Sequence, residues 1–255
     1  MFFLDVQGTL LSDKDKSLIS GAKELISYLN SNNMPYVVVT NNTKKLDFLS
    51  ILKQKGLDIK DNAYIDPFYV LKDILKPCKI AAFGAREFLF SLENLGFELD
   101  FNHPEALLIS SYDDFKFKDF ANMIELIKKD IRVIAMHETS IYKKDNRLYP
   151  GVGSIMAMLK NATNFNYEVV GKPSLAFYKE ALKLIQKQNE QINFEDICIV
   201  SDDFKGDLLE AKNLNMKCIL VLSGKMSDTK GIDISLLDKI YPSVLELLGE
   251  LKCKI

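Results

Sequence analysis

The sequence has no tryptophan and only two histidines, His103 and His137, among its 255 residues. Its four cysteines never form a Cys-x-x-Cys pair. Zinc sites combine closely spaced Cys and His ligands, and small disulfide scaffolds need many paired cysteines. The shortage of both residue types argues against a zinc site of the finger or His-Glu-x-x-His kind and against a disulfide framework.

An excess of charge and long apolar runs are missing as well. Lys plus Arg number 33 and Asp plus Glu number 35, a net charge of −2, which argues against a nucleic-acid or anionic-membrane partner. No apolar run approaches the roughly 18 residues that span a bilayer. Only residues 1–4 precede Asp5, too few for the apolar region of a signal peptide. We therefore expect a cytoplasmic protein.

What the sequence does have is the composition of an ordinary globular protein, with 47% hydrophobic and 27% charged residues. Its length allows one large domain or two small ones. Apolar runs at residues 1–4, 36–39 and 197–200 each stop at polar residues, a pattern typical of strands in a buried parallel sheet. Residues at helical spacing separate these runs, so the predicted fold class is α/β.

The middle of the chain shows the same alternation. Strands are predicted at residues 79–83, 106–109 and 131–136, with helices at 117–128 and after Gly153. This part of the chain has enough apolar sequence for a core of its own.

Polar residues follow three of the predicted strands. Asp5 follows the first strand, Thr40 and Asn41 follow the second, and Asp202 and Asp203 follow the strand at 197–200. Ligands of parallel α/β sheets bind outside the carboxyl ends of the strands, where these residues would meet. Each has a plainer explanation on its own, as a turn or helix cap or as a solvated acidic turn.

Charged residues in two further segments fit the same site. Lys172 precedes a predicted helix in Gly171-Lys172-Pro173, and Asp207 joins Asp202 and Asp203 to give three carboxylates within six residues. Clustered acids repel one another unless a cation lies among them, and Mg²⁺ suits one or two carboxylates with carbonyl and substrate oxygens.

Taken together and in this order, segments 3–10, 38–43, 171–174 and 201–207 resemble the four motifs of the haloacid dehalogenase (HAD) superfamily. The match is closest to its NagD-like, p-nitrophenyl-phosphatase-type branch, in which a C2 cap domain is inserted between the second and third motifs. The resemblance implies a Rossmann-like parallel-sheet core made of residues 1–64 and 169–255. It implies an inserted α/β cap made of residues 65–168.

The resemblance also implies a magnesium-dependent site. Asp5 matches the nucleophile that forms an aspartyl phosphate. Mg²⁺ would be held by Asp5, by the backbone carbonyl of Gln7 and by Asp202, with Asp203 and Asp207 in support.

The remaining implied roles concern the substrate. Thr40 and Asn41 would hold the phosphoryl oxygens, and Lys172 would neutralise charge on the nucleophile and on the transferring group. His137 and Glu138 are the candidate substrate contacts in the cap segment, where they replace an Asn-rich stretch frequent in relatives. Relatives are often dimeric through the cap, so the resemblance leaves a homodimer through the cap open.

Position 7 departs from the family pattern. Phosphatases of the family carry a second Asp two residues after the nucleophile, which protonates the leaving oxygen and later deprotonates water; here the residue is Gln7. An amide does neither. General acid and base assistance is worth roughly 10² to 10⁴ in rate, so its loss raises the barrier by roughly 3 to 5 kcal/mol.

The function predicted is a Mg²⁺-dependent phosphohydrolase of small phosphorylated metabolites or nucleotide monophosphates, acting through Asp5 and slowed by Gln7. Two alternatives stay open. One is a catalytically silent protein that binds a phosphorylated ligand, and the other is a phosphotransferase that passes the phosphoryl group from Asp5 to an acceptor other than water.

Overall fold

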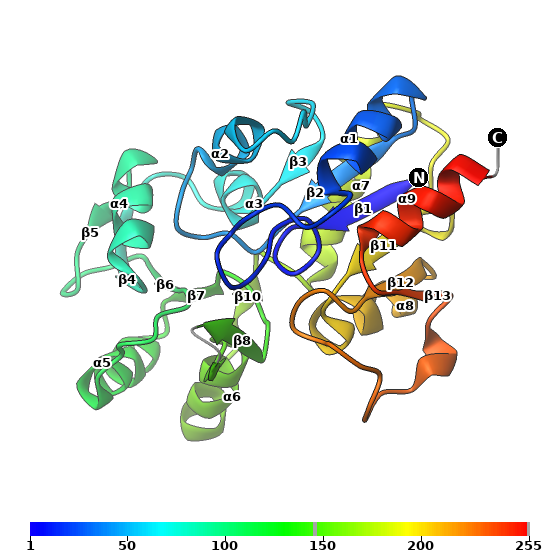
Figure 1. Cartoon of the computed structure of the whole chain (residues 1–255). Coiled ribbons are helices and arrows are strands. Elements are labelled where there is room, and N and C mark those ends of the chain that lie inside the picture. Colours follow the sequence, from blue (N-terminus) through cyan, green and yellow to red (C-terminus); the bar gives the residue numbers. More distant parts are fainter. Residues whose placement is uncertain (145–146, 254–255) are drawn as a thin grey trace.

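The structure, a computed structural model, describes residues 1–144 and 147–253 of the chain. Its larger sheet contains six parallel strands in the order β13-β12-β11-β1-β2-β3 (Figure 1). The strands of this sheet are β1 (Phe2–Asp5), β2 (Tyr36–Val39), β3 (Tyr64–Ile65), β11 (Cys198–Ser201), β12 (Lys217–Val221) and β13 (Lys239–Tyr241).

A second parallel sheet of five strands comes from the middle of the chain, in the order β10-β7-β6-β4-β5. Its strands are β4 (Lys79–Phe83), β5 (Glu98–Leu99), β6 (Ala106–Ile109), β7 (Arg132–Ala135) and β10 (Glu168–Val169). An antiparallel hairpin of β8 (Ile141–Lys144) and β9 (Arg147–Pro150) follows β7. The predicted α/β class with parallel sheets is confirmed. The division at 64/65 and 168/169 stays a prediction.

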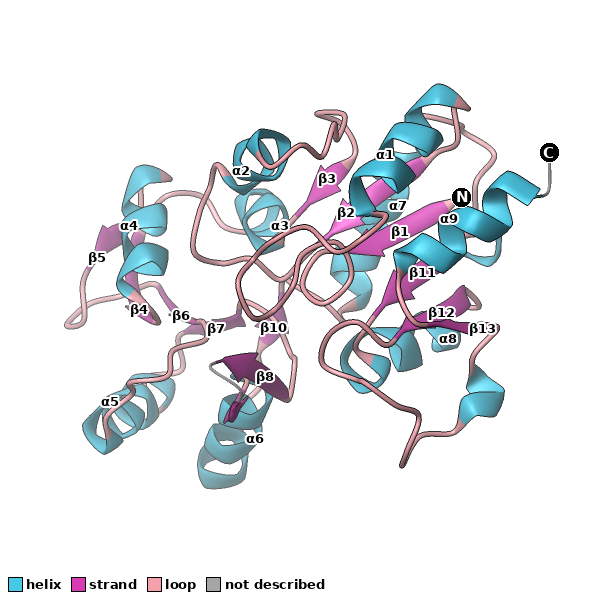
Figure 2. Ribbon diagram, viewed as in Figure 1, coloured by secondary structure: helices cyan, strands magenta, loops and turns pink. Residues whose placement is uncertain are grey.

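Helices cover both faces of both sheets (Figure 2). Side chains from α1 (Ala22–Ser31), α2 (Phe48–Gln54) and α9 (Val244–Cys253) pack in one cluster with one face of the six-stranded sheet. The opposite face packs against α3 (Pro67–Ile74), α7 (Leu175–Gln186) and α8 (Leu209–Asn213). In the second sheet, one face packs against α4 (Arg86–Asn94) and the other against α5 (Phe117–Ile127) and α6 (Val152–Thr163).

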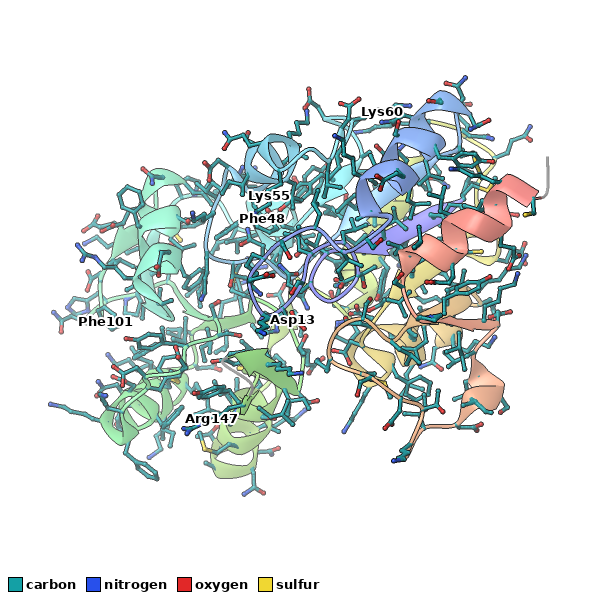
Figure 3. The ribbon with its side chains drawn as sticks, viewed as in Figure 1. Asp13, Phe48, Lys55, Lys60, Phe101 and Arg147 are labelled. Atoms are coloured by element: carbon teal, nitrogen blue, oxygen red, sulfur yellow. The ribbon has the colours of Figure 1, made fainter. Side chains whose placement is uncertain are left out.

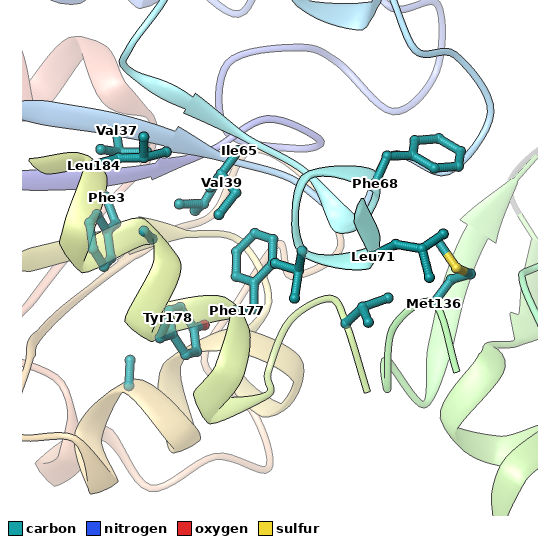
Figure 4. Packing of buried hydrophobic residues seen from close by; sticks show 14 of the residues in the cluster. Phe3, Val37, Val39, Ile65, Phe68, Leu71, Met136, Phe177, Tyr178 and Leu184 are labelled. Atoms are coloured by element: carbon teal, nitrogen blue, oxygen red, sulfur yellow. The ribbon is translucent and has the colours of Figure 1, made fainter. Parts of the chain in front are cut away.

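One hydrophobic cluster runs from the larger sheet into the smaller one (Figure 4). Phe68 and Leu71 of α3 lie between Phe177 of α7 and Met136, which follows β7. All four side chains are at most 2% exposed. Since protein interiors are densely packed, this continuity holds the second sheet against the first and fixes the ends of its strands in space.

The order of the strands places a crevice above β1. The chain leaves β1 for β2 on one side, whereas β11, from the C-terminal part of the chain, lies on the other side of β1. This is a topological switch point, the usual place for ligands in a parallel α/β sheet. The long segment 6–21 between β1 and α1, dark blue in Figure 1, loops over this edge.

Two features of the sequence, its apolar runs and its cysteines, can be followed in residues 1–144 and 147–253. None of the helices there combines the length and the apolar character needed to cross a bilayer. The four cysteines are free thiols.

Replacing Phe88 tests the packing of the second sheet. Phe88 on α4 is fully buried, with its ring 6.2 Å from the ring of Phe68. We expect Phe88→Ala to lower the free energy of unfolding by about 3 to 5 kcal/mol, because it leaves a cavity. Phe117→Ala, at a ring that is 91% exposed, is the matched control and should change it by less than about 0.5 kcal/mol. Urea denaturation measures both, and equal effects would contradict the packing described.

Candidate active site

A buried lysine joins two carboxylates at the carboxyl end of β1. The Lys172 Nζ donates hydrogen bonds to Asp5 Oδ1 at 2.5 Å and to Asp207 Oδ2 at 2.7 Å. The three side chains are between 3 and 7% exposed. Lys172 lies in the loop before α7, where Ser174 caps the helix by accepting a hydrogen bond from the Phe177 N–H at 3.2 Å. This short loop aims the ammonium at the sheet edge.

The charges of this group depend on one another. Burial lowers the pKa of Lys172, but the negative charges of Asp207 and Asp5 outweigh burial and hold that pKa above its usual range. Burial raises the pKa of Asp5, and the positive charge of Lys172 opposes this rise. Lys172 is therefore a permanent cation beside the carboxyl group of Asp5.

Asp207 is positioned by the segment that follows β11. The Ser201 hydroxyl donates to Asp207 Oδ2 at 2.6 Å. A single turn of π-helix, Phe204–Leu208, carries Asp207 back toward Lys172. Asp203 caps this turn by accepting from the Gly206 N–H at 2.9 Å, and a Cβ at Gly206 would lie 2.3 Å from Asp203 Oδ2. A side chain at position 206 would therefore displace that carboxylate.

Asp202 occupies a tight cradle next to this group. A Cβ atom on either Gly8 or Gly224 would lie 2.0 Å from Asp202 Oδ2. The backbone N–H of Lys225 donates to the same oxygen. Burial and then the charge of Asp5 raise the pKa of Asp202 well above its usual range. The negative charge of Asp5 thus acts on the buried carboxyl group of Asp202.

These residues fit a hard divalent cation. Within the described ranges no group of three or more His, Cys, Asp or Glu side chains is arranged to hold a metal ion. Mg²⁺, however, is often held by only one or two carboxylates together with carbonyl groups and water. The buried Asp202 carboxyl group, held tightly between Gly8 and Gly224 and subject to the negative charge of Asp5, is the local feature that favours a cation here.

Gln7 is held by the end of β2. The Thr40 hydroxyl donates to Gln7 Oε1 at 3.0 Å and accepts from the Asn42 N–H at 3.2 Å. With its oxygen occupied, Gln7 has its amide N–H groups to offer to a ligand.

Asn41 ties the two halves of the site together. Its Oδ1 accepts from the Lys172 N–H at 2.8 Å, and its Nδ2 donates to Thr139 Oγ1 at 3.1 Å. The side-chain amide of Asn41 therefore already has protein partners on both of its polar atoms.

A cavity of about 380 Å³ opens above these residues. It brings together most of the residues predicted from the sequence: Asp5, Gln7, Asn41, His137, Lys172, Asp202, Asp203 and Asp207. The fully buried Thr40 lies behind Gln7 and does not line this cavity in the described part of the chain. Neither does Glu138, whose carboxylate accepts a hydrogen bond from the Tyr167 hydroxyl.

Several lining residues were missed by the sequence reasoning. The Lys225 ammonium donates to Asp203 Oδ2 and, at 2.9 Å, to the backbone carbonyl of Ile141 on the hairpin. Asp13, labelled in Figure 3, lines the cavity from the loop after β1, and Ser111 lines it just after β6. Ser111 and Lys225 both follow carboxyl ends of parallel strands, so the strand-end rule would have found them.

His137 is a buried neutral base. Its ring is only 5% exposed, and burial, with the charges of Lys225 and Lys172 acting in the same direction, lowers its pKa to about 3. His137 Nδ1 accepts from the Thr139 N–H at 3.3 Å, and His137 Nε2 lies 2.8 Å from Ser111 Oγ. A histidine in this state does not supply protons near neutral pH.

Comparisons with known families match both ends of the chain. A model described as haloacid dehalogenase-like hydrolase matches residues 2–98. A second, described as HAD-hydrolase-like, matches residues 169–247.

Curated relatives span most of the chain at low identity. A phospholysine phosphohistidine inorganic pyrophosphate phosphatase from Mus musculus is 26% identical over 232 residues, covering 87% of this chain and 82% of the relative. A dihydroxyacetone phosphatase from Corynebacterium glutamicum is 24% identical over 235 residues, covering 90% and 83%.

Solved structures show the same fold. A p-nitrophenyl phosphatase from Archaeoglobus fulgidus superposes with a TM-score of 0.81 at 21% identity, covering 98% of each chain. NagD from Escherichia coli K-12 superposes with a TM-score of 0.75 at 23% identity, covering 96% of each chain.

The protonation state of His137 can be measured directly. Because its pKa is lowered to about 3, the folded protein should keep the ring neutral as the pH falls from 8 to 5. The unfolded chain takes up a proton near pH ~6.5, so this residue favours unfolding increasingly below that pH. Nitrogen-15 NMR of the histidine rings, with the exposed His103 as internal reference, should show a proton on Nε2 at both pH values. A charged His137 ring at pH 5 would contradict this.

Proposed function

The chain belongs to the haloacid dehalogenase-like hydrolases, and on that premise we propose that it hydrolyses phosphate monoesters with Asp5 as the nucleophile. The observation that carries the proposal is the buried Lys172 ammonium, which contacts both Asp5 and Asp207 at the base of the cavity. This arrangement orients one carboxylate toward a ligand and supplies the positive charge that a phosphoryl group needs.

Mg²⁺ is the cofactor we propose for the site. Asp5, Asp202 and the backbone carbonyl of Gln7 would hold it, with Asp203 supporting from the neighbouring turn. When bound, the cation screens the repulsion between a carboxylate nucleophile and the phosphoryl oxygens.

The chemistry then proceeds in two displacements. A carboxylate oxygen of Asp5 attacks the phosphorus, and the bond from phosphorus to the ester oxygen breaks as an aspartyl phosphate forms. The leaving oxygen takes a proton from solvent. Water next attacks the phosphorus, which releases inorganic phosphate, frees a proton to solvent and returns Asp5 to its carboxylate. Lys172 stays charged throughout and neutralises the phosphoryl group.

Gln7 makes both displacements slow. The residue lines the cavity beside Asp5, where an amide N–H can donate a hydrogen bond to the leaving oxygen but cannot transfer a proton. His137 does not replace the missing acid, since burial keeps it neutral. We therefore propose that esters with good leaving groups, such as aryl or acyl phosphates, react faster than alkyl phosphates.

The size of the cavity supports a small substrate. A volume of about 380 Å³ lies at the lower end of the range for small-molecule sites. Relatives that match the chain include enzymes named dihydroxyacetone phosphatase and acid sugar phosphatase. We propose small phosphorylated metabolites or nucleotide monophosphates as the substrate class.

Replacing the nucleophile tests the proposal as a whole. A panel of phosphorylated metabolites, assayed for phosphate release with and without Mg²⁺, should give Mg²⁺-dependent turnover with the native protein. Asp5→Asn should abolish it, because an amide does not form the acyl phosphate. Phosphate release that persists in Asp5→Asn would overturn the mechanism. Mg²⁺-dependent binding of the panel without any turnover would instead support a silent ligand-binding protein.

Restoring a carboxylate at position 7 tests the role of Gln7. We expect Gln7→Asp to raise kcat by roughly 10² or more on alkyl phosphates, and by less on aryl phosphates, whose leaving groups need little protonation. Gln7→Asn keeps an amide and serves as the matched control, with no gain expected. Equal rates on matched aryl and alkyl esters in the native protein would contradict the assignment, as would an unchanged kcat in Gln7→Asp.

A further inference from the structure

Ser111 and His137 lie side by side at the carboxyl ends of neighbouring strands in the second sheet. Strand β6 ends at Ile109 and β7 ends at Ala135, and these two residues are register partners. The two residues that follow shortly after, Ser111 and His137, line the same cavity as Asp5. The inserted segment thus faces the proposed nucleophile with a hydroxyl group and an imidazole.

The hydrogen bonds of His137 define where its proton lies. Nδ1 accepts from the Thr139 N–H at 3.3 Å, so it carries no proton of its own. In a neutral ring the proton is then on Nε2. Nε2 lies 2.8 Å from Ser111 Oγ, and with the proton on Nε2 the imidazole is the donor in this hydrogen bond.

Because His137 is the donor in this hydrogen bond, the Ser111 hydroxyl keeps its own proton to donate. A serine hydroxyl has one donor and two acceptor positions, and His137 occupies one of the acceptor positions. Within residues 1–144 and 147–253 the Ser111 side chain makes no other hydrogen bond. Its O–H therefore lies at the cavity wall, ready to donate to an acceptor that a bound ligand brings.

His137 packs against the segment that carries Lys172, the lysine that contacts Asp5. A Cβ on Gly171 would lie 2.9 Å from the His137 Cβ and 2.7 Å from Asn41 Oδ1, so the segment before Lys172 packs directly on the histidine. Asn41 Nδ2 holds the Thr139 hydroxyl, and Asn41 Oδ1 holds the Lys172 N–H. These contacts connect the histidine that holds Ser111 to the segment that carries Lys172.

We infer that Ser111 is a specificity-determining residue, whose hydroxyl donates a hydrogen bond to an oxygen of the substrate's leaving group, and that His137 positions it. This rests on the proposed function. The substrates favoured are phosphate esters whose leaving group carries a hydroxyl, carbonyl or carboxylate oxygen in addition to the ester oxygen. Esters of the same size without such an oxygen leave the Ser111 donor unpaired when they bind, which is unfavourable.

The test compares two pairs of esters that differ only in that oxygen. Glycerol 1-phosphate is matched with propyl phosphate, and 2-phosphoglycolate with ethyl phosphate. Ser111→Ala should lower kcat/KM for the oxygen-bearing member of at least one pair by about 3- to 10-fold, the value of one neutral hydrogen bond, and leave its partner within about 2-fold. Ser31→Ala, on the exposed part of α1, controls for the substitution itself and should change neither. An equal loss on both members, or no loss on either pair, would overturn the inference.

A binding measurement separates this inference from the proposed function. In the Asp5→Asn background, calorimetry gives the Kd of each ester without turnover. Adding Ser111→Ala should raise the Kd of the oxygen-bearing ester by the same factor and leave the Kd of the matched ester unchanged. A native protein that binds these esters and hydrolyses none of them would sink the proposed function alone, whereas an unchanged Kd ratio would sink the role of Ser111.

Variants of His137 test its positioning role. His137→Leu removes the N–H that orients Ser111, so it should reduce the preference for the oxygen-bearing ester as much as Ser111→Ala does. The Ser111→Ala/His137→Leu double variant should reduce this preference no further than either single variant. His137→Gln keeps an N–H of similar reach and should restore part of the discrimination. Losses that add in the double variant, or identical behaviour of the Leu and Gln variants, would contradict the positioning role.

Discussion

The site depends on one buried interaction, the Lys172 ammonium held between Asp5 and Asp207. Removing a buried cation from between two carboxylates leaves two uncompensated negative charges in the interior, which destabilises the folded protein. The structure surrounds the lysine accordingly: Ser201 holds Asp207, and Asn41 holds the Lys172 backbone. The edge of the six-stranded sheet, the π-turn after β11 and the loop before α7 all serve to bring these groups together.

The second sheet is coupled to this group through the residues that flank Lys172. Asn41 reaches Thr139, Gly171 packs on His137, and the hydrophobic cluster around Phe68 and Phe177 joins the two sheets behind them. Lys225 adds a contact on the opposite side of the cavity, from Asp203 to the hairpin. These contacts connect the residues proposed to select a leaving group with those proposed to handle the phosphoryl group.

Much of this arrangement could be predicted from the sequence, because its elements have strong local patterns. The apolar runs before Asp5, Thr40 and Asp202 became β1, β2 and β11, and the strand-end rule placed their polar residues together. The two-residue strands β3, β5 and β10 have no period to detect. The tautomer of His137 and the reach of Lys225 depend on tertiary contacts, which no local pattern encodes.

Asp5, oriented by Lys172, is the residue that we propose receives the phosphoryl group. The most direct measurement is rapid chemical quenching of the protein with a phosphorylated substrate and Mg²⁺, followed by mass spectrometry of its peptides. With an aryl phosphate, whose leaving group needs little protonation, the peptide containing Asp5 should gain the mass of one phosphoryl group early in the first turnover, and this species should build up because Gln7 does not activate water. Phosphate release with no phosphorylated peptide, or a phosphoryl group on another residue, would contradict it.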